Sequence, residues 1–167
     1  MKTIVTPITN EVINEIAVGD MIYISGYIYT GRDAVLPKLV KLIESNELKQ
    51  IGIDLQGSVI FHTAVSPAGV GPTSSNKLEI EGSIPILSKA GVKLHLGKGE
   101  LNKKTVEELD KYNSVYAVIP PVTALLGSKI LEQSVAAFPE EGMEAFHLLK
   151  VDSFPAIIAA AHGKTIY

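Results

Sequence analysis

Hydrophobic positions along the chain switch repeatedly between the spacing of a β-strand and that of an α-helix. Residues 21–30 (MIYISGYIYT) are rich in Ile and Tyr, which favours a strand, and Gly26 in the middle predicts a bulge or a close backbone approach. From Asp33 onward the apolar residues recur at helical spacing. Because Pro37 is tolerated only in the first turn, this helix is expected to begin between Asp33 and Leu36.

The same alternation continues to the end of the chain. Residues 66–75 (SPAGVGPTSS) indicate a loop rich in Pro and Gly. The pattern as a whole predicts a single α/β domain with a largely parallel or mixed sheet. Further strands are expected at 2–7, 59–65, 92–96, 114–119, 145–151 and 155–160, and further helices after Thr9, from Ser74 or Ser75 with an interruption at Gly82 and Pro85, at 105–112 and at 122–133.

Composition narrows the classes of function. The chain has 167 residues, of which 46% are hydrophobic and 20% charged, as in ordinary globular proteins. The absence of cysteine excludes a disulfide, a thiolate nucleophile and a Cys-ligated zinc or iron–sulfur site on this chain. A net charge of −3 argues against nucleic acid as the main partner. No run reaches the ~20 apolar residues of a membrane span, and no targeting signal is recognisable, so a cytoplasmic protein is expected.

Three glycine-bearing loops follow predicted strands, at residues 31–33, 71–75 and 97–99. In an open α/β sheet, the loops at the carboxyl ends of the strands line the crevice where ligands bind. Two of these loops carry a cation, Arg32 and Lys98. The third carries hydroxyl groups beside the start of a predicted helix, whose N–H groups suit an anion. Together the loops predict a pocket for a small anion.

Each loop also has a purely structural interpretation. Arg32 and Asp33 could form a surface pair at a helix start, with Asp33 as the N-cap. The loop at 71–75 could be a turn with a helix cap, and Lys98 a solvated side chain in a turn. Residues 97–100 also lack the Ser or Thr that follows the lysine of a nucleotide-binding phosphate loop.

Other polar residues within the predicted strands favour packing over chemistry. His62 and His95 alternate with apolar residues, as core histidines do. The four histidines lie in separate segments, so a metal site is not expected. Ser74 and Ser75 lack the surroundings of a serine nucleophile. Tyrosines at 23, 27 and 29 are expected to form one packed face.

Four segments in this order, VGDMIYISGYIYTGRDAVLPKL, GPTSSNKLE, GVKLHLGKGEL and FPAIIAAAHG, resemble the β subunit of L-tartrate dehydratase. They are equally similar to the C-terminal region of class I, iron–sulfur-dependent fumarate hydratases. The resemblance spans residues 2–166 and implies a swivelling β/β/α fold, with residues 1–167 as one domain. It also implies a hydro-lyase that reversibly dehydrates a small hydroxy-dicarboxylate. A four-iron cluster on a partner α subunit is implied as well, in a hetero-oligomer in which this chain binds no cofactor.

The resemblance assigns roles to individual residues. Arg32 matches the arginine that contacts a substrate carboxylate, and a guanidinium can bind a carboxylate through two parallel hydrogen bonds. Thr73 matches the first Thr of a Gly-Pro-Thr-Thr motif and is expected to transfer a proton at carbon. Lys98 matches a lysine that stabilises the negative charge formed as the proton leaves. The other expected substrate-binding residues are Gly71, Ser74 and Lys77.

Three positions depart from the family's pattern. Leu36 stands where the family usually has a histidine, Lys77 replaces an arginine, and Ser74 replaces the second threonine. Lysine supplies charge but no bidentate fork. Two hypotheses therefore stay open: a catalytic β subunit, or a non-catalytic, stand-alone anion-binding or regulatory relative.

Overall fold

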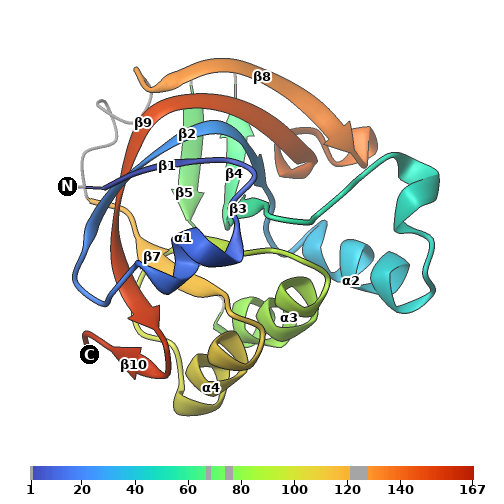
Figure 1. Ribbon diagram of the computed structural model, residues 1–167. Coiled ribbons are helices and arrows are strands. Elements are labelled where there is room, and N and C mark those ends of the chain that lie inside the picture. The colour runs from blue at the N-terminus through green and yellow to red at the C-terminus, as the bar shows by residue number, and fades with distance from the viewer. Residues whose placement is uncertain (1, 67–68, 74–76, 121–127) are drawn as a thin grey trace.

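A mixed sheet that closes on itself forms the centre of the molecule, as the computed structural model shows (Figure 1). The structure describes residues 2–66, 69–73, 77–120 and 128–167, and describes no side chains between 66 and 80. The strands are β1 (Lys2–Val5), β2 (Met21–Thr30), β3 (Val59–Phe61), β4 (Thr63–Ser66), β5 (Gly69–Thr73), β6 (Leu94–Gly97), β7 (Val115–Val118), β8 (Ile130–Ala137), β9 (Phe146–Ala161) and β10 (Lys164–Thr165). The helices are α1 (Asn10–Asn14), α2 (Leu36–Glu44), α3 (Lys77–Lys89) and α4 (Lys103–Lys111), with short 3₁₀ helices η1 (Leu48–Ile51) and η2 (Pro139–Glu144).

Strand pairing closes the sheet into a ring. Strands β2, β3, β6 and β7 are parallel neighbours in that order. Strand β9 pairs antiparallel with β7 and, along its other edge, with β2. Strand β1 extends the sheet beside β2, β8 pairs with β9, and β4 and β5 form a separate antiparallel hairpin. The predicted mixed sheet is therefore confirmed, whereas the swivelling-domain assignment stays a prediction.

Apolar side chains fill the ring and the space beneath the helices. The largest buried cluster joins residues of β2, β3, β6, β7 and β9 with Ile4, Ile8, Ile13 and Ile16. A second cluster packs α2 and the end of α3 against Ile60 on the other face of the sheet. Alternating strand residues thus face the inside of the ring or the helices, which is why the strands read as continuous apolar runs.

Several elements expected from the sequence are confirmed. Thr9 caps α1 by accepting a hydrogen bond from the Val12 N–H group at 3.4 Å. Helix α2 begins at Leu36 with Pro37 in its first turn. The register between β2 and β9 shifts beside Gly26, where an added Cβ atom would collide with the Thr6 side chain.

Other expectations about secondary structure were wrong, and tertiary pairing explains why. The strand expected at 59–65 breaks at His62, and part of the expected loop that follows pairs as the hairpin β4–β5. The two strands expected at the C-terminus are the single strand β9, within which Ser153 has φ of 53°.

Two helix predictions also differ from the structure. Helix α3 continues through Gly82 and Pro85, because the buried Ile84 and Leu87 hold it against the core despite the missing proline N–H. Of the helix expected at 122–133, residues 130–133 belong to β8, and 121–127 lie outside the described residues. No described helix is both long and apolar enough to cross a membrane.

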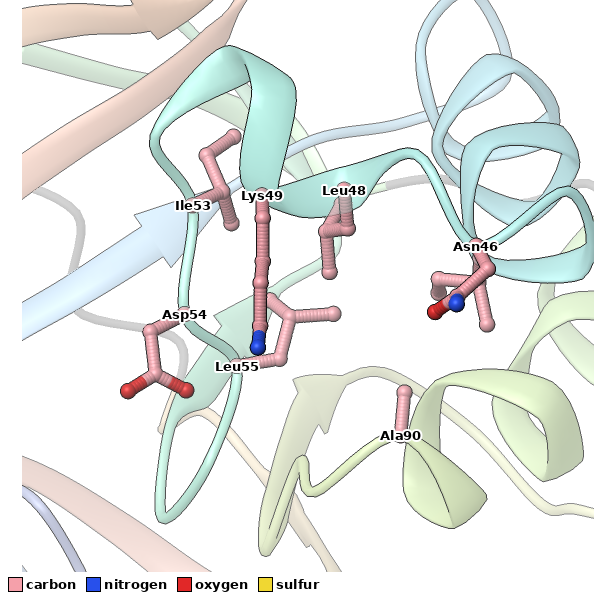
Figure 2. Close-up of a pocket in the computed structure, with 8 residues that line it drawn as sticks. Asn46, Leu48, Lys49, Ile53, Asp54, Leu55 and Ala90 are labelled. Atoms are coloured by element: carbon pink, nitrogen blue, oxygen red, sulfur yellow. The ribbon is translucent and has the colours of Figure 1, made fainter.

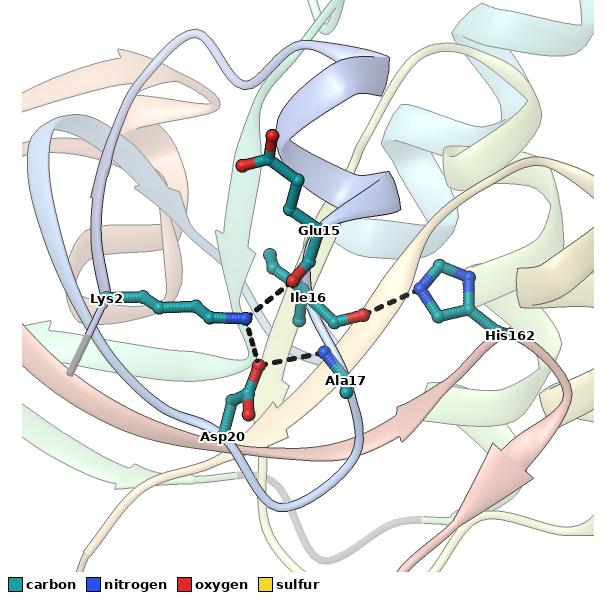
Figure 3. Close-up of polar contacts among 6 residues, drawn as sticks. All are labelled: Lys2, Glu15, Ile16, Ala17, Asp20 and His162. Atoms are coloured by element: carbon teal, nitrogen blue, oxygen red, sulfur yellow. Dashed lines mark hydrogen bonds and ion pairs between the residues drawn. The ribbon is translucent and has the colours of Figure 1, made fainter.

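A polar cluster ties β1 to the turn before β2 and to the C-terminal hairpin (Figure 3). Lys2 Nζ donates to the Glu15 carbonyl oxygen at 2.5 Å and to the Asp20 carboxylate at 2.7 Å. His162 Nε2 donates to the Ile16 carbonyl oxygen at 2.7 Å. The hydrogen bond from Lys2 holds the pKa of Asp20 below its usual value.

Candidate active site

The topology places two of the predicted cations at one edge of the sheet. Because β2, β3 and β6 are parallel, their carboxyl ends meet at the same edge. Arg32 lies two residues after β2, and Lys98 directly follows β6. The Gly31 N–H group donates to the Phe61 carbonyl oxygen at 3.0 Å, so the ladder between β2 and β3 continues to the residue before Arg32. These are the ends at which ligands bind in α/β sheets.

The hairpin β4–β5 brings the predicted proton-transfer residue back to the same edge. Strand β4 begins at Thr63, just past the end of β3, and Thr63 is the register partner of Thr73 at the end of β5. Gly71 lies within β5, and Lys77 is the first residue of α3. Ser74 lies outside the described residues. The backbone therefore gathers the expected loops, with Thr73 at the end of a strand rather than in a loop.

Arg32 is held by a carboxylate that sequence reasoning missed. Its Nε donates to Glu144 Oε2 at 3.1 Å, and its Nη2 pairs with Oε1 of the same carboxylate. The two side chains are 26% and 29% exposed, so the pair is mostly shielded from solvent. The hydrogen bonds to Glu144 raise the pKa of Arg32 above its ordinary value. The sequence signal for this partner was the group of acidic residues at 140–144. Arg32 is the only arginine in the sequence, and a carboxylate is the usual partner of a guanidinium.

The residues that follow Arg32 serve the core. The N-cap of α2 is Val35, without a side-chain hydrogen bond, so the structural interpretation of Asp33 as the cap is wrong. Leu36 is buried and packs with Val35 and Leu39. Position 36, where the resemblance implied a histidine, is therefore an apolar core position in this chain.

The loop that carries Lys98 is shaped by its two glycines and by Tyr116. The Tyr116 hydroxyl on β7 donates to the Gly99 carbonyl oxygen at 3.1 Å. A Cβ atom at Gly97 would lie 3.1 Å from that hydroxyl, and Gly99 has φ of 79°, which favours glycine. Burial raises the pKa of Tyr116, so its hydroxyl stays protonated and can donate. Lys98 itself is exposed at the tip of this loop.

A buried histidine pair lies between the sheet and α3. His62 Nε2 is 3.2 Å from His95 Nδ1, and His95 Nε2 is 2.9 Å from Ser88 Oγ. Burial lowers the pKa of His62 to about 4 and holds that of His95 well below its ordinary value, so both rings are neutral at pH 7. The expectation that these are core histidines is confirmed. His62 Nδ1 has no hydrogen-bond partner in the described part of the chain.

Among the described residues, neither a metal-binding cluster nor the cavity drawn in Figure 2 lies at this edge. Within the described ranges, no group of three or more His, Asp or Glu side chains could hold a metal ion. A cavity of about 440 Å³ is lined by residues that include Leu48, Lys49, Asp54 and Leu55 (Figure 2). Because Leu55 precedes β3 and the lining residue Ala90 precedes β6, this cavity lies at the opposite ends of the strands from Arg32 and Lys98.

Comparison with known proteins gives the family. A family model described as the fumarase C-terminus matches residues 2–167. The chain belongs to this family. Its fumarase C-terminus domain is 30% identical to the L(+)-tartrate dehydratase subunit beta of Escherichia coli K12, over 99% of this chain and 86% of that protein.

Two further relatives show how widely this domain is shared. A candidate β subunit of L(+)-tartrate dehydratase from Methanocaldococcus jannaschii is 30% identical over 96% of this chain and 88% of its own length. A candidate class I fumarate hydratase from Geobacillus stearothermophilus is 29% identical over 99% of this chain but only 33% of its own length. The domain thus matches a nearly complete β subunit in one case and a third of a longer chain in the other.

Proposed function

We propose that this chain is the β subunit of a hydro-lyase that reversibly dehydrates a small hydroxy-dicarboxylate of the malate or tartrate type. The observation that carries the proposal is the meeting of the loops of Arg32, Thr73 and Lys98 at one edge of the sheet. Membership of the fumarase C-terminus family and the names of its relatives support the same reaction class.

The three residues have complementary tasks in this proposal. Arg32 binds one carboxylate of the substrate and fixes its orientation. The Thr73 hydroxyl moves a proton at the carbon next to a carboxylate, which requires a cationic site closed to water because an unassisted hydroxyl is a weak base. Lys98 stabilises the negative charge that develops on the substrate as that proton leaves.

The chain contains no cysteine, so it supplies no thiolate ligand to an iron–sulfur cluster. By resemblance, the cluster belongs to a partner α subunit, and we propose a hetero-oligomer in which the two chains enclose the substrate.

Co-expression with a candidate α chain tests the proposal. The complex is purified without oxygen, its cluster is reconstituted, and turnover is measured with L(+)-tartrate, malate, fumarate and longer hydroxy-diacids. We expect turnover of at least one diacid by the complex and none by either chain alone. A fully assembled, iron-loaded complex that dehydrates none of them would contradict a catalytic role.

A second function is favoured by two positions, Leu36 and Lys77. By the resemblance, the apolar Leu36 replaces a titratable side chain at the start of α2, and Lys77 cannot form a bidentate fork. These differences are compatible with a non-catalytic relative that binds a small anion. Such a protein would bind diacids as tightly alone as with the α chain, which calorimetry on the purified chain with and without that chain would detect.

A further inference from the structure

A small cavity lies against the face of β2 that points away from the inside of the ring. Its volume is about 160 Å³, and its lining includes Tyr27 and Tyr29 of β2. These tyrosines alternate with Ile28, which belongs to the buried cluster inside the ring. The segment before β3 contributes Asp54 and Ser58 to the lining. None of these residues belongs to the candidate active site.

Ser58 brings a buried hydroxyl without a partner to this cavity. The residue is only 8% exposed, and its Oγ atom makes no hydrogen bond within the described ranges. A buried hydroxyl that makes no hydrogen bond destabilises the folded state, so native proteins rarely keep one. A donor or acceptor on a ligand in this cavity would supply the missing hydrogen bond.

Asp54 gives the cavity a negative charge with a fixed orientation. Its Oδ1 accepts a hydrogen bond from the Gln56 N–H group at 3.0 Å. In the larger cavity of Figure 2, which Asp54 also lines, its carboxylate points away from Leu48. Burial, with the Asp54 charge as a second cause, raises the pKa of Tyr29, so this charge reaches the tyrosine side of the smaller cavity.

The two tyrosine rings suit a positively charged ligand. The Tyr29 ring is held in place by stacking on Phe146, with ring centroids 4.7 Å apart. Lys150 of β9 places its Nζ 6.0 Å from the centroid of the Tyr27 ring, so this ring already attracts a cation of the protein. Among the described residues that line the cavity, Asp54 is the only charged one. The lining therefore favours a cation over an anion.

Backbone hydrogen bonds hold the remaining wall in place. This wall consists of Thr6 and Pro7, in the loop after β1. The Thr6 N–H group donates to the Ser25 carbonyl oxygen at 3.0 Å, and the Ile8 N–H group donates to the Gly57 carbonyl oxygen at 2.7 Å. The cavity is thus formed before a ligand arrives, as most small-molecule sites are.

We propose that this cavity binds the primary ammonium group of a small amine. The ammonium group donates to the Asp54 carboxylate and to Ser58 Oγ, and the short apolar body lies against the Tyr27 ring. A primary ammonium has three N–H donors for these oxygens, whereas a quaternary ammonium has none. The volume restricts the ligand to a few non-hydrogen atoms. The site is independent of the proposed hydro-lyase function, so each can fail without the other.

Titrations of the ¹⁵N-labelled full chain, followed by NMR, test the ligand class. The probe is n-butylamine, and the controls are n-butyrate, n-butanol and tetramethylammonium, which have a similar size. We expect n-butylamine to shift the amide signals of Asp54, Gln56 and Ser58 with a Kd of about 1 mM. Each control should bind at least about tenfold more weakly. Equal binding of tetramethylammonium, or no saturable binding of n-butylamine up to about 50 mM, would overturn the proposal.

Substitutions in the chain test the two polar contacts. Asp54→Asn keeps an acceptor for the Gln56 N–H group but removes the charge, so Kd should rise at least about tenfold. Glu47→Gln removes the same charge from an exposed position outside the lining and should change Kd by less than about twofold. An equal effect of both substitutions would reduce Asp54 to a distant charge and contradict the site.

Ser58→Ala separates a ligand contact from a structural hydroxyl. The variant should raise Kd at least about threefold, and its urea unfolding midpoint should stay unchanged or rise, because the hydroxyl loses no partner. A lower midpoint with an unchanged Kd would show that the hydroxyl serves the fold and would contradict the contact.

Two lysine variants locate the amine. Of the two cavities that Asp54 lines, Lys49 lines only the larger, so Lys49→Gln should leave Kd unchanged. Tighter binding in Lys49→Gln would place the amine in the larger cavity and overturn the assignment. Lys150→Gln should bind n-butylamine as tightly or more tightly, since a competing cation is removed from Tyr27. Weaker binding in Lys150→Gln would contradict a cation site. None of these titrations depends on turnover by the complex.

Discussion

The cations at the sheet edge differ in how much the protein itself shields them. Arg32 is mostly covered and bound by Glu144, whereas Lys98 is exposed at a loop tip. An exposed charge contributes about 0–1 kcal/mol to an ion pair, because water screens it. A charge enclosed by a partner contributes several times more. The free energy that Lys98 contributes to an ion pair therefore depends on what covers this edge of the sheet.

This contrast gives a prediction for Lys98→Ala. In the isolated chain, we expect the variant to weaken binding of L(+)-tartrate or fumarate by less than about 1 kcal/mol. In the complex with the α subunit, the loss should reach about 2–5 kcal/mol in kcat/KM, since the site is then closed to water. Calorimetry on the chain and steady-state kinetics on the complex measure the two values. Equal small losses in both would mean that Lys98 stays outside the site.

Thr73 is predicted to act in the transition state rather than in binding. Thr73→Ala should lower kcat by at least about 100-fold with little change in KM, the usual contribution of a proton-transferring group. Thr73→Ser keeps the hydroxyl and should be mild. Kinetics of the complex with both variants decide the point. Equal turnover by Thr73→Ala and the wild type would move the proton transfer to another group.

At the scale of elements, the loop after β6 takes its shape from a tyrosine on β7. Tyr116→Phe removes the hydrogen bond to Gly99 and should cost about 1 kcal/mol of unfolding free energy. It should also raise KM in the complex, because the Lys98 loop loses its anchor. Tyr112→Phe at the end of α4 is the control, since there the backbone carbonyl accepts from Lys93. Urea unfolding measures the first effect, and an unchanged KM would separate the loop from the site.

The histidine pair between β3, β6 and α3 predicts a pH-dependent stability. The pKa of His62 is about 4 in the folded protein and 6.5 in an unfolded chain, so the unfolded state takes up a proton first as the pH falls. Stability is therefore complete above pH 6.5 and is lost between pH 6.5 and 4, by about 2–4 kcal/mol for this group. Urea unfolding from pH 7.5 to 4.5 should show a flatter slope in His62→Gln. A slope identical to that of the wild type would contradict the assignment.

Features of the fold that depend on the backbone preferences of single residues were predicted from the sequence. The cap at Thr9, the start of α2 and the bulge at Gly26 follow from backbone preferences of individual residues, and all three were predicted. The sequence did not predict that β9 is one continuous strand, or that residues 130–133 belong to a strand. Both depend on pairing with partners far away in the sequence. Such pairing overrides local propensity.

The same difference between local and long-range information explains which residues of the candidate site were predicted. Arg32, Thr73 and Lys98 were proposed from their loops and a resemblance, and the parallel order of β2, β3 and β6 explains why those loops meet. Glu144 was missed because it lies 112 positions from Arg32 and reaches it only through the register of β2 and β9. No periodicity within either segment carries that information.

For the whole molecule, the proposal that the α subunit alone holds the iron–sulfur cluster can be tested on the purified chain. Without cysteine, the chain should bind no stoichiometric iron after anaerobic reconstitution and should show no dehydratase activity alone. Iron analysis and a tartrate assay before and after adding the α subunit measure both. Stoichiometric iron with turnover by this chain alone would overturn the two-subunit proposal.

The closing of the ring by β9 also determines when the site can form during folding. Strand β9 pairs with β2 over nearly the whole length of β2, although Met21 and its partner Ile157 lie near opposite ends of the sequence. Contacts this distant are slow to form, because closing the long intervening stretch of chain costs conformational entropy before the contacts can stabilise it. During synthesis, β2 and Arg32 emerge long before Glu144 and β9. One edge of β2 therefore stays open, and the proposed anion site lacks the Arg32–Glu144 pair, until β9 has left the ribosome.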